Sequence, residues 1–218
     1  MKRRRKWPDI ITFFQRISKA EHGTLPPLSV SGSNVQKGEH GSRVYADQEV
    51  LGELETIGFL KDLKFVEGRS TRQVSFSFAD HNIRNWLRDV GSALELYIYK
   101  VCLDTGIFHD VMSSVIVDWD GTIGHDSVSN EIDAVASRGC VPIFISCKAC
   151  EVRTEAINEL AILRDRFGGK GAKGVVVSTE YCNAAARHRA AQLGLAVIDL
   201  EEIEAGAAGD RIRIIMKA

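Results

Sequence analysis

Two apolar segments joined by a glycine-containing turn, between Asn130 and Cys150, constrain the fold of this chain more than any other stretch. We interpret them as a pair of antiparallel strands. The first carries Glu131 and Asp133, and the second ends with Ser146 and Lys148. Side chains two residues apart lie on the same face of a strand. The pairing therefore predicts that carboxylates and an ammonium group meet at one rim of a β-sheet.

The elements around this pair indicate the fold class. Hydrophobic periodicity in the second half of the chain predicts amphipathic helices and short apolar runs typical of buried parallel strands. In chain order, we expect a helix over 85–103, a strand over 108–119, the strand pair within 130–150, a helix over 151–167, a strand over 173–178, a helix over 183–193, and strands over 195–200 and 212–216. A three-stranded meander followed by alternating helices and strands predicts an α/β fold, in which helices flank a mixed β-sheet.

The chain is interpreted as two parts, a tail with a small α+β module over 1–80 and a main domain over 81–218. The expected elements of the first part are a helix over 8–20, a loop rich in Gly, Ser and Pro over 23–41, a helix over 47–57 that ends at Gly58, and two strands over 59–66 and 69–78. One helix followed by a two-stranded wing is too little to indicate a nucleic-acid-binding module.

Charge and composition narrow the function classes. The chain has 218 residues and a formal net charge of −1, so binding to nucleic acid would require a local basic patch. The basic run at residues 2–6 is interpreted as a solvated tail. No apolar run reaches the roughly 18 residues of a membrane span, and no apolar signal-peptide core follows the basic run. We therefore expect a cytoplasmic protein.

The five cysteines predict free thiols, because an odd number in a chain without a signal peptide argues against a disulfide framework. Cys147 and Cys150 form a CxxC pair, but a zinc site needs a second pair of ligands. Neither a zinc site nor a redox role is the favoured interpretation of this pair.

One motif offers an alternative chemistry. Residues 115–122 match the hhhDxDGT signature of haloacid-dehalogenase-type phosphohydrolases, in which Asp118 would be the nucleophile and Asp120 the general acid. That fold needs a helix after the motif, whereas here the chain runs directly into another strand. Asp followed by Gly is a strong turn signal, so a turn is the favoured interpretation and a phosphohydrolase the alternative.

The strand pair itself carries the residues of a metal-dependent phosphodiesterase site. Such a site needs a carboxylate for Mg²⁺ or Mn²⁺, a second oxygen ligand, and a lysine that orients the attacking water and offsets phosphate charge. Asp133 and Lys148 lie at neighbouring strand ends, and the backbone carbonyl of Cys147 is a candidate ligand between Ser146 and Lys148. These residues predict a nuclease.

The same residues resemble a known superfamily. A helix carrying Glu95, the strand segment 130–133 (Asn-Glu-Ile-Asp), the strand end 144–148 (Phe-Ile-Ser-Cys-Lys) and the segment 166–169 (Arg-Phe-Gly-Gly) are similar to the PD-(D/E)XK restriction-endonuclease superfamily. More narrowly, they resemble the C-terminal nuclease domain of CRISPR-associated Rossmann-fold (CARF) ancillary nucleases. The match covers residues 82–205.

The resemblance implies a restriction-endonuclease-like fold and a metal-dependent endonuclease that hydrolyses DNA or RNA with Mg²⁺ or Mn²⁺. It further implies a homodimer and a role in CRISPR-associated antiviral defence. The segment before the match shows no Rossmann-like repeat, so regulation by cyclic oligoadenylate is expected only if a sensor domain exists elsewhere.

Ser146 is a departure from the superfamily pattern, which has Glu or Asp two residues before the lysine. One interpretation is that the carboxylate has moved, and the candidates are Glu159, Glu155, Glu95 and Glu131. The other is a decayed site in a domain that only binds nucleic acid or dimerises. The predicted catalytic set is Asp133, Lys148, Glu95, Glu131 and Ser146, and the predicted metal ligands are Asp133, the Cys147 carbonyl, Glu95 and Glu159.

A glycine-rich segment after the 151–167 helix offers contacts for phosphate. Arg164, Lys170 and Lys173 are the candidate nucleic-acid-binding residues there. The segment lacks the GK[ST] order of a P-loop. A glycine-rich helix end followed by a strand is the plainer interpretation.

Overall fold

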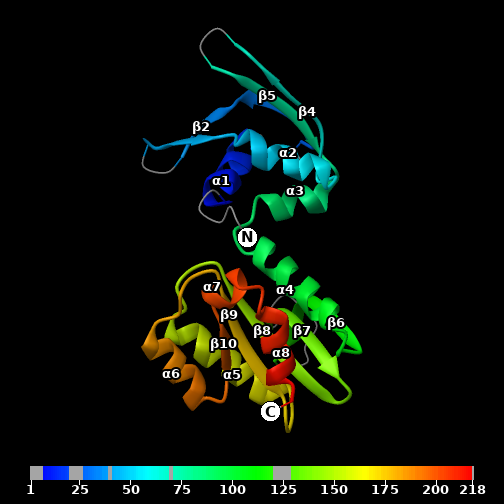
Figure 1. The fold of residues 1–218 in the computed structure, drawn as a ribbon, viewed down its shortest axis with the longest axis vertical. Helices are drawn as coiled ribbons and strands as arrows, with labels where there is room; N and C mark the ends of the chain where they lie inside the picture. The colour runs from blue at the N-terminus through cyan, green and yellow to red at the C-terminus, as the bar shows by residue number, and fades with distance from the viewer. Residues whose placement is uncertain (1–6, 20–26, 39–40, 69–70, 120–128, 218) are drawn as a thin grey trace. The chain divides into compact units, whose positions relative to one another are not determined.

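The computed structural model of the chain describes residues 7–19, 27–38, 41–68, 71–119 and 129–217 (Figure 1). Contacts divide the chain into two compact units, Met1–Ser92 and Ala93–Ala218. Each unit has its own buried hydrophobic clusters. No helix within the described ranges is long and apolar enough to cross a membrane.

Small antiparallel sheets and short helices make up the described part of the first unit. Its elements are α1 (Trp7–Ile17), β1 (Ser29–Ser33), β2 (Val35–Lys37), β3 (Arg43–Tyr45), α2 (Gln48–Thr56), β4 (Leu60–Val66), β5 (Gln73–Phe78) and α3 (His81–Leu87). One sheet has the strand order β1-β5-β4, and the other pairs β2 with β3. The core combines aliphatic side chains with packed phenylalanines, whose ring centroids lie 5.7 Å apart for Phe14 and Phe76 and 5.3 Å apart for Phe76 and Phe78. The two expected helices and the hairpin of β4 and β5 are confirmed.

The loop expected over 23–41 is wrong in its second part, where β1 and β2 lie. β1 pairs with β5 along its whole length, and only Val30 on it is buried. Serine and glycine fill its other positions. Because neither apolar alternation nor β-branched enrichment marks this strand, periodicity could not identify it.

The single helix expected over 85–103 is two helices, α3 and α4 (Ser92–Thr105). Asp89 lies between them, and its carboxylate accepts hydrogen bonds from the backbone N–H of Ser92 (2.7 Å) and from the hydroxyl of Ser92 (2.8 Å). An aspartate that satisfies the free N–H groups at a helix start favours a new helix over continuation of the previous one. Ile83 and Leu87 of α3 belong to the core of the first unit, which is why the contacts place the boundary after Ser92.

The second unit is built on one five-stranded sheet. Its elements are α4, β6 (Asp110–Asp118), β7 (Ser129–Arg138), β8 (Val141–Lys148), α5 (Thr154–Phe167), β9 (Lys173–Ser178), α6 (Ala184–Gln192), β10 (Ala196–Ile198), α7 (Leu200–Glu204) and α8 (Ala208–Ile215). The strand order is β10-β9-β8-β7-β6. β6, β7 and β8 form an antiparallel meander, and β8, β9 and β10 are parallel. This sheet confirms the expected mixed topology.

Helices cover both faces of this sheet, as expected. Residues of α4, α7 and α8 share one hydrophobic cluster with Ile143, Ile145 and Cys147 of β8. Residues of α5 and α6 share the other cluster with Phe144 of β8. Alternate residues of β8 therefore face opposite layers, as the two-residue repeat of a strand requires.

The strand expected over 212–216 is wrong, because this segment lies in α8 and at its end. Ala208 and Ile212 are fully buried and Met216 is 8% exposed, at intervals of four residues, whereas Ile214 is 56% exposed. In a strand, Ile212, Ile214 and Met216 would share one face. The helical repeat separates Ile214 from the other two.

We predict that Ile212→Ala lowers the free energy of unfolding by about 2–5 kcal/mol, because it leaves a cavity in a fully buried site. Ile214→Ala should change it by less than about 0.5 kcal/mol, as is usual for exposed positions. Urea unfolding of the two variants beside the original chain measures both. Equal effects at 212 and 214 would contradict the helical assignment.

Candidate active site

A cavity of about 50 Å³ lies where β7 and β8 face α5. The residues that line it come from these three elements: Glu131, Ile132, Asp133, Ser146, Lys148, Ala156, Glu159, Leu160 and Leu163. Ser146 and Lys148 reach it because they follow Phe144 at two-residue spacing on the α5 face of β8. Asp133, Glu131, Ser146 and Lys148, which the sequence predicts at one rim, thus line one cavity.

The ladder between β6 and β7 is interrupted opposite Asp133. Bridged pairs lie on both sides of the interruption, Ser113 with Ala134 and Val115 with Ile132. Ser114, between them, has a φ of 51°, a conformation that is uncommon for a residue other than glycine. Backbone of this kind is often found at functional sites.

The same irregularity appears in the burial of β7. Ala134 and Ala136 pack in the cluster under α4, yet Ile132 packs in the cluster under α5. Strict alternation would place Ile132 with the two alanines. A change of face at this point of β7 is a feature that a two-residue repeat in the sequence cannot predict.

Asp133 is anchored to β8. Its Oδ2 accepts a hydrogen bond from the backbone N–H of Cys147 at 2.5 Å and one from the Ser146 hydroxyl at 3.4 Å. Burial raises the pKa of Asp133, and the negative charge of Glu131 raises it further. The Cys147 amide, Lys148 and the Ser146 hydroxyl act in the opposite direction without cancelling the rise. The surroundings therefore disfavour the ionised form of Asp133, and additional positive charge nearby would stabilise that form.

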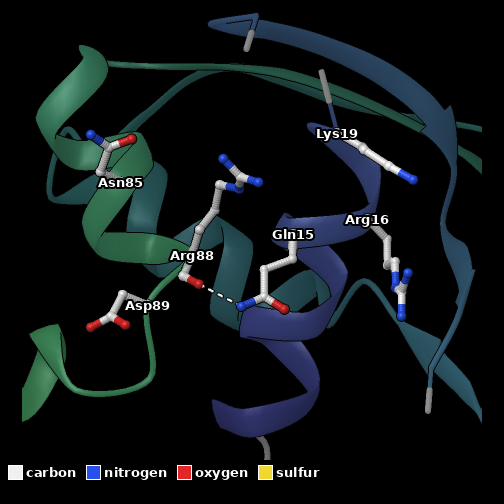
Figure 2. A pocket seen from close by; sticks show the side chains of 6 residues that line it. All are labelled: Gln15, Arg16, Lys19, Asn85, Arg88 and Asp89. Carbon is white, nitrogen blue, oxygen red and sulfur yellow. Dashed lines mark hydrogen bonds between the residues drawn. The ribbon is translucent and has the colours of Figure 1, made fainter. Parts of the chain in front are cut away.

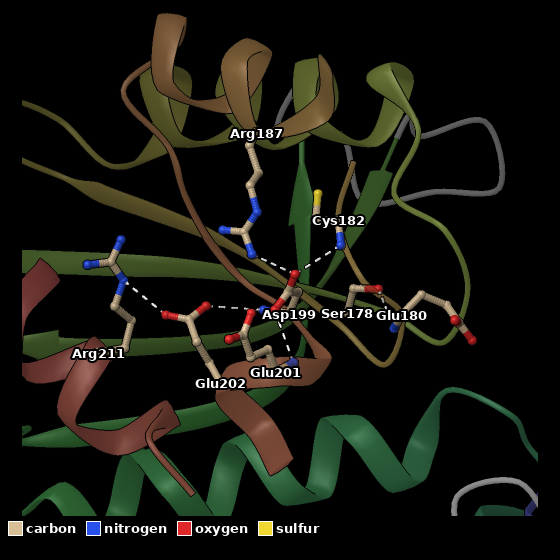
Figure 3. Close-up of polar contacts among 8 residues, drawn as sticks. All are labelled: Ser178, Glu180, Cys182, Arg187, Asp199, Glu201, Glu202 and Arg211. Atoms are coloured by element: carbon tan, nitrogen blue, oxygen red, sulfur yellow. Dashed lines mark hydrogen bonds and ion pairs between the residues drawn. The ribbon is translucent and has the colours of Figure 1, made fainter. Parts of the chain in front are cut away.

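Asp199, a more deeply buried carboxylate than the partly buried Asp133, gives the contrast (Figure 3). Asp199, which begins α7, is 2% exposed and accepts hydrogen bonds from the backbone N–H of Cys182 (2.9 Å) and from Arg187 (2.5 Å). Burial tends to raise the pKa of Asp199, but these two partners and the N–H of Glu201 outweigh burial and lower it. Asp199 is a satisfied structural carboxylate, whereas Asp133 has the raised pKa that is typical of a functional group.

Glu159 projects from α5 beside the sheet residues. The side-chain N–H of Asn130, on β7, donates to Glu159 Oε1 at 2.8 Å. The amide oxygen of Asn130 accepts from the indole N–H of Trp119 at 2.5 Å, and the Trp119 ring packs edge-on against Phe167 at 5.3 Å between centroids. Donation on one side and acceptance on the other fix the orientation of the Asn130 amide.

The sequence reasoning assigned no role to Asn130 or Trp119. A strand that begins with Asn carries no distinctive pattern, and the partner on α5 is 29 residues away in the chain. Only the packing of α5 on the sheet reveals the contact.

Glu95, on α4, does not line the cavity. It lies near the thiol of Cys147, which faces the α4 layer. Burial, then the charges of Asp133 and Glu95, raise the pKa of Cys147 well above its ordinary value. A buried thiol that resists ionisation is a poor metal ligand and a poor nucleophile.

Two other candidate carboxylates are also placed. Glu155 lies in the first turn of α5, is exposed, and is not among the cavity residues. Glu131 lines the cavity and is exposed to solvent.

Arg164 is engaged within the protein. One of its terminal nitrogens donates to the backbone carbonyls of Leu193 (2.9 Å) and Gly194 (3.0 Å), and its Nε donates to Asp165 (2.8 Å). These bonds tie α5 to the turn before β10. Arg164 thus has a structural role in this arrangement.

Lys170 and Lys173 lie at the other end of the sheet from the cavity. Lys173 is in register with Ile143, at the start of β8, and Lys148 is at its end. Lys148 lies five residues after Ile143 on β8, roughly 16 Å away at the usual rise per residue. The cavity residues and these two lysines therefore lie at opposite ends of the strands.

We predict opposite pH effects on the free energy of unfolding for Asp133 and Asp199, measured in EDTA. The raised pKa of Asp133 means that its ionisation costs stability, so Asp133→Asn should gain unfolding free energy over the original chain as pH rises through the pKa of folded Asp133. This gain should vanish below about pH 4, near the pKa of the unfolded group. Asp199 has a lowered pKa, so its charged form stabilises the fold, and Asp199→Asn should be destabilised at neutral pH and less so as pH falls. Urea unfolding between about pH 2.5 and 8 measures both, because the contribution of Asp199 is lost only below about pH 4. An Asp133→Asn profile that follows that of Asp199→Asn would contradict the assignment.

Comparison with known structures supports the fold. Protein VC1899 from Vibrio cholerae matches with a TM-score of 0.67 and 19% sequence identity over 98% of this chain and 52% of that one. Can2 from Sulfobacillus thermosulfidooxidans, in complex with cyclic tetra-adenylate, matches with a TM-score of 0.58 and 18% identity over 100% of this chain and 54% of that one. The chain spans about half the length of each protein.

Sequence comparisons add no assignment. No family model matches the chain, and no curated protein matches it. At these identities the structural likeness shows the fold alone. Together with the mixed sheet and its flanking helices, it confirms the expected α/β fold class, a mixed β-sheet flanked by helices.

Proposed function

We propose that the second unit is a metal-dependent endonuclease that hydrolyses phosphodiester bonds of DNA or RNA. One observation carries the proposal: Glu159 lines the same cavity as Asp133, Ser146 and Lys148. Ser146 removes the carboxylate expected two residues before the lysine, and Glu159 supplies one from the neighbouring helix. A moved carboxylate preserves the negative charge of the site, which a decayed site would have lost.

The donor groups fit Mg²⁺ or Mn²⁺. Asp133 and Glu159 offer carboxylate oxygens, and Mg²⁺ commonly takes one or two carboxylates and keeps several waters. Oxygen donors without histidine or thiolate select these ions over zinc. Within the described ranges, no group of three His, Cys, Asp or Glu side chains is arranged to hold a metal.

The Cys147 carbonyl is a further candidate ligand. The N–H and C=O of one strand residue point to the same side of the strand. The Cys147 N–H donates to Asp133, so the Cys147 carbonyl points toward the Asp133 side of β8 as well. Its position is consistent with the ligand role expected from the sequence.

Each group in the cavity has a separate role in the proposed reaction. A divalent cation, when bound, would neutralise phosphate charge and lower the pKa of water. Lys148 lines the cavity, and in this proposal its ammonium group orients the attacking water and balances charge on the phosphate. Asp133 is held in one orientation by the Cys147 amide, and Glu159 by the Asn130 amide.

The topology argues against the phosphohydrolase alternative. Asp118 ends β6, an edge strand whose partner β7 is antiparallel, with Asp118 opposite Ser129. The phosphohydrolase motif needs a following helix and a parallel strand. Asp120 lies outside the described residues.

The proposal extends to the biological role and the oligomeric state of the protein. We propose a role in CRISPR-associated antiviral defence and a homodimeric assembly, on the strength of the sequence resemblance. The likeness to Can2, which was solved with cyclic tetra-adenylate, is consistent with this setting. Regulation by such a molecule would need a sensor outside these residues.

We predict that the chain cleaves at least one of single- or double-stranded DNA or RNA in Mn²⁺ and not in EDTA. Glu159→Gln, Asp133→Asn and Lys148→Met should each lower the rate by about 10²–10³, because each removes a charge that acts on the reacting phosphate or its metal. Glu155→Gln, one turn earlier on the same helix and outside the cavity, is the matched control and should keep the rate.

Two results would count against the proposal. Full activity of Glu159→Gln would show that the carboxylate has not moved to α5. Binding of nucleic acid without turnover of any substrate, unaffected by EDTA, would favour the decayed, non-catalytic module.

A further inference from the structure

The first unit contains a hollow that is larger than the cavity beside α5 and is lined by polar residues (Figure 2). Its volume is about 510 Å³, within the range of ligand pockets. The lining residues come from α1 and α3 and from the segments that directly follow these helices: Gln15, Arg16, Lys19, Asn85, Arg88 and Asp89. We propose that this hollow binds the phosphate groups of a nucleic-acid backbone. The inference goes beyond the proposed function, because none of the cavity residues of the second unit takes part.

The hollow is held open by a defined contact between its two helices. The side-chain N–H of Gln15 donates to the backbone carbonyl of Arg88 at 2.7 Å, a bond drawn in Figure 2. It fixes the distance between α1 and the end of α3. Arg16 extends from α1 and Lys19 from the segment that follows it, and Arg88 extends between the two helices.

The positive charge of the hollow is not neutralised from within. Asp89 is the one carboxylate among the described lining residues, and its Oδ2 already accepts hydrogen bonds from the N–H groups of Gly91 (3.0 Å) and Ser92 (2.7 Å) at the start of α4. None of the three cations, Arg16, Lys19 and Arg88, forms an ion pair with another described residue. The lining therefore carries an excess of positive charge.

One N–H group of Arg88 lacks a hydrogen-bond acceptor among the described residues. Its Nε is buried and has no hydrogen-bond partner in the described part of the chain, although buried polar groups are nearly always paired. Burial, and then the positive charge of Arg84, lower the pKa of Arg88. An anion in the hollow would relieve both effects.

Phosphate is the anion that this lining fits. A guanidinium group presents its N–H donors in a plane that matches phosphate oxygens, and lysine adds a point charge. Arg16 lies in the last turn of α1 and Lys19 two residues after the end of this helix, and both line the hollow, where they can contact phosphate groups. The volume exceeds what a single ion needs and leaves room for an adjoining sugar. With a net charge of −1 on the whole chain, such a local patch is what nucleic-acid binding requires.

The test measures binding of a labelled single-stranded oligonucleotide to the full chain in EDTA, where turnover does not interfere. The triple variant Arg16→Gln, Lys19→Gln, Arg88→Gln should bind more weakly. The slope of log affinity against log salt should become shallower by about 0.7 for each phosphate that the variant can no longer neutralise. A pair variant with only Arg16→Gln and Lys19→Gln, both exposed side chains, should show part of this weakening without disturbing the fold.

A matched control removes three charges elsewhere in the same unit. Arg43→Gln, Lys61→Gln and Lys64→Gln lie on strands outside the hollow and should leave the slope closer to that of the original chain. Equal weakening in the control and the hollow variant would overturn the proposal, because it would indicate general electrostatic attraction.

Free phosphate is the other source of the same chemistry. Thermal stabilisation by inorganic phosphate that disappears in the hollow variant, with no change in oligonucleotide affinity, would assign the site to a small anion and overturn the nucleic-acid assignment. Because binding is measured without cleavage, a failure here is distinct from a failure of the nuclease proposal.

Discussion

The hydrogen bond from the Cys147 amide to the Asp133 carboxylate is the contact on which the candidate site depends. Backbone pairing of β7 and β8 extends only to Ala134 and Ile145. Beyond that pair, a side chain takes over the role that a carbonyl would have in the ladder. Asp133 is thereby held against β8, and the Cys147 carbonyl points to the same side. Where main-chain hydrogen bonds would otherwise continue between β7 and β8, the Asp133 carboxylate and the Cys147 carbonyl lie on the same side of β8.

With Asp133 held in this way, a carboxylate on α5 can take the place of one on β8 with little change in the structure. Ser146 and Glu159 line the same cavity from a strand and from the helix packed on it. The helix carries Glu159 at a fixed position because Leu160 and Leu163, its neighbours on α5, are buried against the sheet. The Asn130 amide then directs the carboxylate. Rigid elements on both sides suit a site whose charges must stay in place.

The sequence could predict the parts of the fold that repeat regularly. β8 and β9 are continuous apolar runs, and their bounds follow from burial on both faces. The sequence could also predict that Asp133 and Lys148 lie at one rim, because only a two-residue repeat is needed.

Irregular features of the backbone could not be predicted in this way. They are the interruption at Ser114, the change of face at Ile132 and the break at Asp89, and each depends on one backbone conformation or one side-chain bond that overrides the local pattern. The partners of a charged residue such as Arg164 could not be predicted from the sequence either. Its partners include carbonyl groups far along the chain, and the residue type alone does not distinguish such an arginine from one that contacts phosphate.

The contact of Trp119 with Asn130 has an optical consequence. The indole N–H is bonded to the amide that also holds Glu159, so a change at that carboxylate alters the polarity around an indole ring. Trp emission is sensitive to such changes, and Trp119 is one of only three tryptophans in the chain. The arrangement gives the cavity an intrinsic fluorescent reporter, through which occupancy can be followed without a label and apart from any cleavage.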